Sequence, residues 1–234
     1  KSELASIKFP AWYLGRYPEK SIISCSYSAD LAEDFGRYTR AQVDTEVHRK
    51  IFPECQLLTG SKSATRWKVS IRGGYRGTGV GGSITGAGAD VLIIDDPIKN
   101  REEAESDTIR RKIWDWYTST AYTRLEKNGS VILIMTKWHD DDLGGRLLDL
   151  EGEKGYHLDT KANRWEKTTT TYPLGCKVGK WDVLRFPAIA TDPEQFRKKG
   201  EPLWPQKYSL KELLSIKESI GIRDWGALYQ QDPV

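Results

Sequence analysis

The feature that most constrains the fold is the apolar run Val91-Leu92-Ile93-Ile94, which is followed directly by Asp95, Asp96 and Pro97. A run of large apolar residues without polar alternation is typical of a central strand that is buried on both faces of a parallel sheet. Pro97 cannot donate to a strand ladder, and it disfavours helical geometry at Asp96. We therefore expect both acids at the carboxyl edge of the sheet, where open α/β folds bind ligands. The alternative is that they only open a loop and cap the next helix.

Further apolar segments alternate with helical patterns along the chain. The predicted segments are strands at 21–27 and 130–136, helices at 4–14, 28–50 and 100–125 with a stop signal at 126–129, and one arm of a hairpin at 65–71. Buried strands joined by helical crossovers indicate an α/β fold with a mainly parallel central sheet flanked by helices and with antiparallel strands at its edges.

Size, cysteine usage and charge narrow the class of protein. A chain of 234 residues is long enough for one large domain, or for a domain with a small appendage. The three cysteines are scattered and are not in metal-ligand spacing, so we expect reduced thiols in a cytosolic protein. No apolar run reaches membrane-spanning length, so no membrane partner is expected. The net charge of +3 does not by itself require a nucleic-acid partner.

The chain opens on Lys1-Ser2, followed by residues with a helical pattern. A phosphate-binding loop of the Walker A type, Gly-x-x-x-x-Gly-Lys-Ser/Thr, ends in the same two residues and leads into a helix. The dipeptide is a weak signal alone, but together with the strand that ends in Asp95 and Asp96 it predicts a nucleotide site. The glycines of such a loop would precede Lys1. If the chain begins at Lys1, we expect it to bind ATP poorly or not at all.

Glycine recurs from Gly74 to Gly88 without the spacing of a dinucleotide-binding fingerprint, and a strand rather than a helix follows it. Two interpretations have equal support. The segment is either a flexible loop at the ligand-binding edge, from which Arg76 reaches a phosphate or DNA, or a bent glycine-rich strand.

Two polar stretches favour structural roles over functional ones. His139-Asp140-Asp141-Asp142 contains metal-ligand residue types, but at the start of a helix these acids are better interpreted as caps and partners of the helix dipole. From Tyr156 onward, basic residues alternate with aromatic ones in a stretch that we expect to extend the edge of the sheet. This stretch either follows a DNA backbone or forms a solvated surface. An amphipathic helix is predicted at 209–220.

Several strings together resemble the ATPase half of the large terminase subunit of tailed bacteriophages. They are Val91–Asn100, Ile132–Arg146, Gly200–Ser209 and Trp225–Pro233, in that order along nearly the whole chain. The resemblance implies a P-loop NTPase of the additional-strand class over 1–234, starting at the end of Walker A. Residues 200–234 resemble the segment that closes this domain before a nuclease. Because the sequence contains no such nuclease, nuclease activity is not expected.

The resemblance also implies an ATPase site that uses ATP and Mg²⁺. Lys1 would contact the β and γ phosphates, and Ser2 and Asp95 would hold the metal. Asp96, which takes the place of a glutamate in most relatives, would orient the attacking water with a reach shorter by one methylene. Thr136, at the tip of the next strand, matches the motif that couples hydrolysis to movement, although it can also simply end that strand.

An arginine finger is expected on mechanistic grounds, because the transferring phosphoryl group concentrates negative charge. The candidates are Arg76, Arg101 and Arg146, and we assign Arg76 to the catalytic set. The resemblance implies a homo-oligomeric ring that moves double-stranded DNA, with the portal protein and the small terminase subunit as partners, in the host cytoplasm at the portal vertex of the procapsid. The alternatives are another P-loop nucleic-acid ATPase of the helicase type, or a non-catalytic module that binds DNA or the portal.

Overall fold

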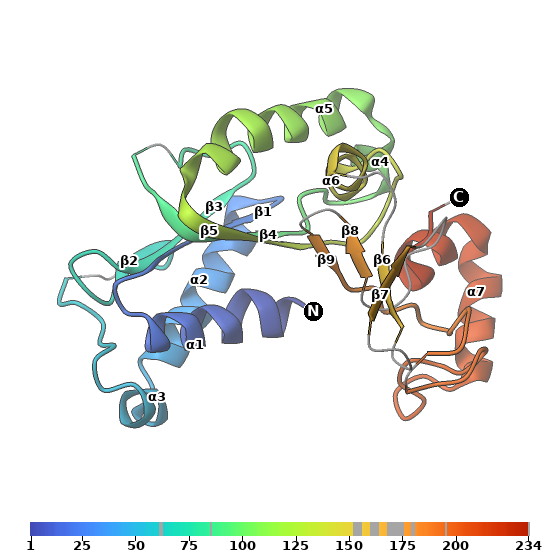
Figure 1. Cartoon of the computed structure of the whole chain (residues 1–234), viewed down its shortest axis with the longest axis horizontal. Helices are drawn as coiled ribbons and strands as arrows, with labels where there is room; N and C mark the ends of the chain where they lie inside the picture. Colours follow the sequence, from blue (N-terminus) through green and yellow to red (C-terminus); the bar gives the residue numbers. More distant parts are fainter. Residues whose placement is uncertain are drawn as a thin grey trace. The chain divides into compact units, whose positions relative to one another are not determined.

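A computed structural model describes most of the chain (Figure 1). The described residues are 1–60, 63–84, 86–151, 156–159, 164–167, 176–178, 181–194 and 196–233. They divide into two compact units, Lys1–Met135 and Thr136–Val234, and each unit has a sheet of its own.

The first unit is built on a five-stranded sheet with the order β2-β3-β1-β4-β5. Its strands are β1 (Ser21–Ser26), β2 (Arg66–Lys68), β3 (Gly74–Gly79), β4 (Ala89–Asp95) and β5 (Leu125–Ile134). β3, β1, β4 and β5 are parallel, while β2 pairs with β3 in the antiparallel direction. The predicted α/β fold, with a mainly parallel sheet and an antiparallel edge strand, is confirmed.

β4 is the central buried strand that its apolar run predicts. Val91, Leu92, Ile93 and Ile94 are at most 3% exposed, because β1 and β5 flank the strand and helices cover both faces of the sheet (Figure 1). One layer contains η1 (Glu3–Lys8), α1 (Phe9–Arg16) and α2 (Ala29–Val43), and the other contains α5 (Asp107–Trp116). The core on the α1 and α2 side is one cluster that includes Leu14, Ile22, Val43, Trp67 and Tyr75.

Two predicted helices are each broken by a new N-cap. The helix expected at 28–50 is α2 followed by α3 (Glu46–Ile51), because the Thr45 side chain accepts a hydrogen bond from the His48 N–H and starts a second helix. The helix expected at 100–125 starts as α4 (Arg101–Glu105). Ser106 then caps α5 by accepting from the Ile109 N–H. Helical turns η2 (Tyr117–Ala121) and η3 (Tyr122–Arg124) complete the segment.

The prediction for β5 is wrong in two respects. The strand begins at Leu125, so the expected helix stop at 126–129 lies inside it, where Asn128 adopts a left-handed φ of 66° and the pairing with β4 shifts register. Val131 to Ile134 are half-buried rather than buried. β5 is at the edge of the sheet and has only β4 as a neighbour among the described strands.

The glycine-rich segment is a strand in its first part and a loop in its second, and Arg76, which the loop interpretation placed in the loop, lies in the strand. Its first part is strand β3, in which the missing side chain of Gly77 lets α2 approach: a Cβ there would lie 2.8 Å from the carbonyl oxygen of Ala32. Its second part is a loop in which Gly81 and Gly86 have φ of 80° and 71°, a conformation that favours glycine.

The second unit contains α6 (Leu143–Glu151), a separate antiparallel sheet, α7 (Leu210–Asp224) and η4 (Trp225–Gln230). The sheet has the order β7-β6-β8-β9, formed by β6 (Tyr156–Asp159), β7 (Arg164–Lys167), β8 (Cys176–Val178) and β9 (Trp181–Val183). The expectation that this stretch extends the first sheet is therefore wrong. The predicted helix at 209–220 is confirmed as α7, which Ser209 and Glu212 start with a capping box.

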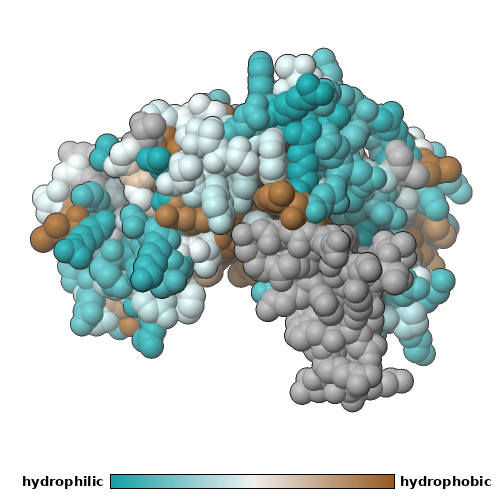
Figure 2. Space-filling view, turned by 45° about the horizontal axis from the view of Figure 1, so that its top comes forward, coloured by the Kyte–Doolittle hydropathy of each residue, from teal (hydrophilic) through white to brown (hydrophobic). Residues whose placement is uncertain are grey.

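Among the described residues, the face of the molecule drawn in Figure 2 is mainly polar. Hydrophilic residues cover most of the face drawn in Figure 2, and hydrophobic residues form small separate groups on it. None of the described helices combines the length and apolar character needed to cross a membrane. Cys25 and Cys55 are buried free thiols, and burial raises the pKa of Cys55 to about 11.

Candidate functional site

The candidate site is centred on Asp95, the last residue of β4, which is 1% exposed. Both of its carboxylate oxygens accept hydrogen bonds from the first helical segment. The Ser2 hydroxyl donates to Oδ1 over 3.1 Å, and the Ser6 hydroxyl donates to Oδ2 over 2.5 Å. Ser2 and Ser6 are four positions apart, so they lie on the same side of the helix and can hold one carboxylate together.

The surroundings of Asp95 set its protonation behaviour. Burial raises its pKa above the ordinary value of 3.8, whereas the hydrogen bonds from Ser6 and Ser2 lower it. The charge of Asp96 raises the pKa further, and the charge of Lys1 lowers it. A buried carboxylate with hydroxyl donors on both oxygens is a preformed oxygen site that a cation would stabilise in its ionised form.

Asp96 adopts a left-handed backbone conformation with φ of 46°. The predicted effect of Pro97 is confirmed in that Asp96 is not in right-handed helical geometry. Two hydrogen bonds hold the residue there: its N–H donates to the Ile134 carbonyl over 2.8 Å, and its carbonyl accepts from the Tyr27 N–H over 3.1 Å. Asp96 therefore joins the carboxyl ends of β1, β4 and β5, and its side chain remains half-buried at this edge.

Lys1 and Ser2 lie at the amino end of the first helical segment, as predicted. The Lys1 carbonyl accepts from the N–H groups of Leu4 and Ala5, both over 3.1 Å. The Lys1 ammonium donates to the carbonyl of Met135, directly after β5, over 3.0 Å. The structure thus brings Lys1, Ser2, Asp95 and the backbone of Asp96 to one edge of the sheet.

Thr136 follows Met135 in the chain and is the first residue of the second unit. Thr136 is assigned to the catalytic set because the sequence predicts it at the tip of the strand that follows β4. The hydrogen bond from Lys1 to the Met135 carbonyl shows that the chain immediately before Thr136 lies at the candidate site.

Arg76 is not brought to the edge where the acids lie. It is in the middle of β3, opposite Ile23 of β1, whereas Asp95 is aligned with Ser26, which in turn is opposite Gly79. Three residues along a strand correspond to about 10 Å. Any catalytic role of Arg76 within this chain would have to span that separation.

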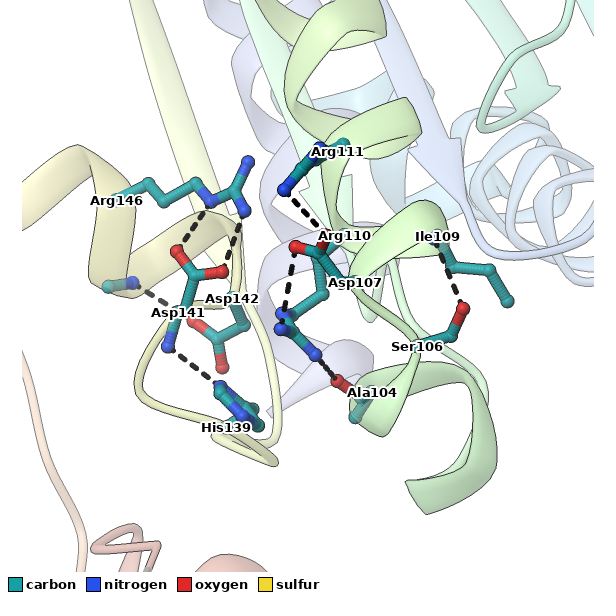
Figure 3. Close-up of polar contacts among 11 residues, drawn as sticks. Ala104, Ser106, Asp107, Ile109, Arg110, Arg111, His139, Asp141, Asp142 and Arg146 are labelled. Atoms are coloured by element: carbon teal, nitrogen blue, oxygen red, sulfur yellow. Dashed lines mark hydrogen bonds and ion pairs between the residues drawn. The ribbon is translucent and has the colours of Figure 1, made fainter.

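The other two arginine candidates have different surroundings. Arg146 is held by Asp141 through two hydrogen bonds of 2.7 Å each, which is the bidentate geometry of a strong ion pair (Figure 3). Arg101 is the first residue of α4, next to the N-cap Asn100. Arg110, which was not a candidate, donates to the Ala104 carbonyl and pairs with Asp107 in its own helix (Figure 3).

The His139–Asp142 string has the capping role that its sequence predicts. Asp142 Oδ1 accepts from the Gly145 N–H over 2.9 Å, and His139 Nδ1 accepts from the Asp141 N–H over 2.9 Å (Figure 3). Burial is the main cause that raises the pKa of Asp142 to about 6. Among the residues that the structure describes, no group of three or more His, Cys, Asp or Glu side chains is arranged to hold a metal.

Sequence reasoning missed Ser6. It is fully buried, and its own carbonyl accepts from the Thr39 hydroxyl of α2 over 3.2 Å. The sequence feature that could have indicated Ser6 is its hydroxyl four residues after Ser2, on the same face of a helix whose first turn was predicted to bind a nucleotide. That signal is detectable only once the partner, Asp95, is known.

A mainly parallel sheet with two acids at its carboxyl edge, facing a Lys-Ser helix start, is an arrangement typical of α/β proteins that bind nucleotides. The family model described as "Terminase large subunit, T4likevirus-type, N-terminal" matches residues 1–218. The chain belongs to this family, which confirms the resemblance found in the sequence.

Two other comparisons are weaker. Among solved structures, the crystal structure of the HK97 bacteriophage large terminase is similar, with 18% identity and a TM-score of 0.38. The match covers 56% of this chain and 25% of the HK97 chain, so the region matched is a minor part of that protein. No curated protein matches the sequence significantly.

Proposed function

We propose that this chain is the ATP-hydrolysing motor part of a viral large terminase subunit, which moves double-stranded DNA into a procapsid. The observation that carries the proposal is the hydrogen bond of 3.1 Å between Ser2 Oγ and Asp95 Oδ1. It joins the predicted end of Walker A to the predicted Walker B acid across 93 residues of sequence.

The oxygen atoms of this pair fit Mg²⁺. Adjacent ligands of an octahedral ion with bonds of 2.0–2.1 Å lie about 3 Å apart, and Ser2 Oγ and Asp95 Oδ1 are separated by 3.1 Å. A hydroxyl and a carboxylate are also ligands of the hard type that Mg²⁺ prefers. When bound, the ion neutralises charge on the β and γ phosphates.

The remaining residues divide the work of hydrolysis between them. Lys1 would exchange its bond to the Met135 carbonyl for the β and γ phosphates of ATP, because a phosphate oxygen is the stronger acceptor for an ammonium. Asp96 would orient the attacking water, with its backbone fixed by Ile134 and Tyr27. Thr136, next to the carbonyl that Lys1 releases, would transmit the change toward the second unit.

The proposal extends to the assembly. A motor of this type acts as a homo-oligomeric ring with the portal protein and the small terminase subunit, at the portal vertex in the host cytoplasm. An arginine from a neighbouring subunit can then complete the phosphate site.

The test is ATP turnover with and without double-stranded DNA, in a chain that also carries the residues before Lys1. We expect Mg²⁺-dependent turnover that DNA stimulates, and loss of turnover in both Asp95→Ala and Asp96→Ala. Unchanged turnover in both variants would remove the acids from the mechanism. DNA binding without any turnover would instead support the alternative of a non-catalytic DNA-binding module.

A further inference from the structure

A second group of charged residues gathers at the other end of the same sheet. Four basic residues line a hollow of about 190 Å³ next to β2, β3 and the start of β1, and no acidic residue is among the residues that line it. They are Arg66, Lys68, Arg72 and Arg76. β2 and β3 form the edge of the sheet opposite to β5.

Strand alternation explains why Arg66, Lys68 and Arg76 share one face. Trp67 and Tyr75 are opposite each other on β2 and β3, and their rings stack at 5.2 Å in the core beside α1 and α2. Their neighbours therefore point to the other face. Arg66 and Arg76 are direct partners in the antiparallel ladder, so two guanidinium groups are placed side by side.

Two like charges directly opposite each other destabilise a sheet. Arg76 is half-buried and Arg66 is exposed. Burial lowers the pKa of Arg76, and the charge of Arg66 lowers it further. An anion bound between the two groups would offset both effects, because each guanidinium can bind a phosphate through two parallel N–H donors.

The rest of the lining is uncharged. It consists of the small residues Ser21, Gly74, Gly86, Ala87 and Gly88 and of the larger residues Ile22, Ile23, Trp67 and Tyr75. The volume is sufficient for a phosphate group. Lys68 and Arg72 lie beside the arginine pair and extend the positive charge along the edge of the sheet.

Building on the proposed function, we propose that this hollow binds the backbone phosphates of double-stranded DNA, with Arg66 and Arg76 as the central contacts. Contacts to phosphates carry no sequence information, which suits a protein that moves along DNA of any sequence. The occupant follows from charge complementarity: duplex DNA presents about one negative charge per 1.7 Å of its axis, and the charged residues that line the hollow are all basic.

The test is the affinity for a duplex of arbitrary sequence, measured by fluorescence anisotropy over a range of NaCl concentrations. We expect Arg66→Gln to reduce the slope of log K against log salt by about 0.9 for one lost phosphate contact, or about eightfold in affinity at 0.1 M salt. The matched control is Arg16→Gln. It removes the same charge from an exposed arginine at the end of α1, in the layer on the opposite face.

The proposal is overturned if the two variants weaken DNA binding equally, if the salt slope of Arg66→Gln is unchanged, or if the parent chain does not bind DNA. It is also overturned if Arg66→Gln keeps DNA affinity and loses ATP turnover in the absence of DNA, because the hollow would then serve a nucleotide. A chain that binds DNA through Arg66 and never hydrolyses ATP would refute the proposed function and leave this site intact.

Discussion

Replacing Ser6 by alanine tests whether the buried carboxylate of Asp95 depends on its hydroxyl donors. The substitution removes the 2.5 Å hydrogen bond to Oδ2 and leaves the bond from Ser2 to Oδ1. A hydrogen bond to a charged group contributes about 1.5–3 kcal/mol. For a chain of this size that corresponds to a fall in Tm of about 3–12 °C.

The dependence on pH follows from the direction of the pKa shift. Burial already raises the pKa of Asp95, so the ionised form costs free energy in the folded state, and the bond from Ser6 offsets part of this cost. Without Ser6 the pKa rises further. The added destabilisation is therefore largest above the pKa of Asp95 in the folded protein, where the carboxyl is ionised, and it shrinks as the pH falls through that pKa.

Thermal unfolding of Ser6→Ala and Ser26→Ala at neutral and acidic pH is the assay. Ser26 is a matched control because it is also 0% exposed and aligned with Asp95, and its hydroxyl has no hydrogen-bond partner within the described part of the chain. Removing that hydroxyl should be neutral or slightly stabilising. Equal losses in the two variants, or a Ser6→Ala loss that does not change with pH, would refute the reasoning.

Three further predictions concern other residues. Asp96→Asn should keep the stability of the parent chain and lose ATP turnover. Asp96→Ala should also lose ATP turnover, and its free energy of unfolding in urea should fall by about 1 kcal/mol, because alanine tolerates the φ of 46° less well. The pKa of Asp142, raised by burial from 3.8 to about 6, should make stability fall by about 3 kcal/mol as pH rises between these values. Asp142→Asn should remove this dependence in a pH series of unfolding curves. Gly36→Ala should destabilise by about 1–3 kcal/mol in the same assay, since its Cβ would lie 2.2 Å from the Ala64 carbonyl oxygen.

The strongest local patterns predicted the fold correctly. The apolar run that forms β4 is best satisfied by a strand buried on both faces. The alternation of strands and helices around it then predicts a parallel sheet. Helix interruptions at Thr45 and Ser106 were missed because a capping hydroxyl inside an apolar pattern resembles an ordinary polar position until its hydrogen bond is seen. The separate sheet of β6 to β9 was missed because strand signals do not show which strands will pair.

The candidate site was predicted only in part, because sheet topology fixes the positions of some of its residues and not of others. Residues at strand ends and helix starts, such as Asp95 and Ser2, are placed by the topology of an α/β sheet, so their meeting can be expected from sequence. Arg76 could not be placed in this way. Its distance from the acids depends on the register of β3 against β1, and nothing in the glycine-rich segment fixes that register in advance.

The two serines on Asp95 differ in a way that assigns separate tasks to the two carboxylate oxygens. Ser6 is fully buried and its carbonyl accepts from Thr39, so its backbone is fixed against α2 and its bond to Oδ2 is shielded from water. Ser2 is half-buried at the start of that segment, and its bond to Oδ1 is longer. Under the proposed function, Oδ1 would therefore be the oxygen available to Mg²⁺, while the bond from Ser6 to Oδ2 would keep the carboxylate oriented. Ser6→Ala should then raise the Mg²⁺ concentration that gives half-maximal turnover, and it should lower turnover at saturating Mg²⁺ by a smaller factor. A loss of saturating turnover with an unchanged Mg²⁺ dependence would contradict this division.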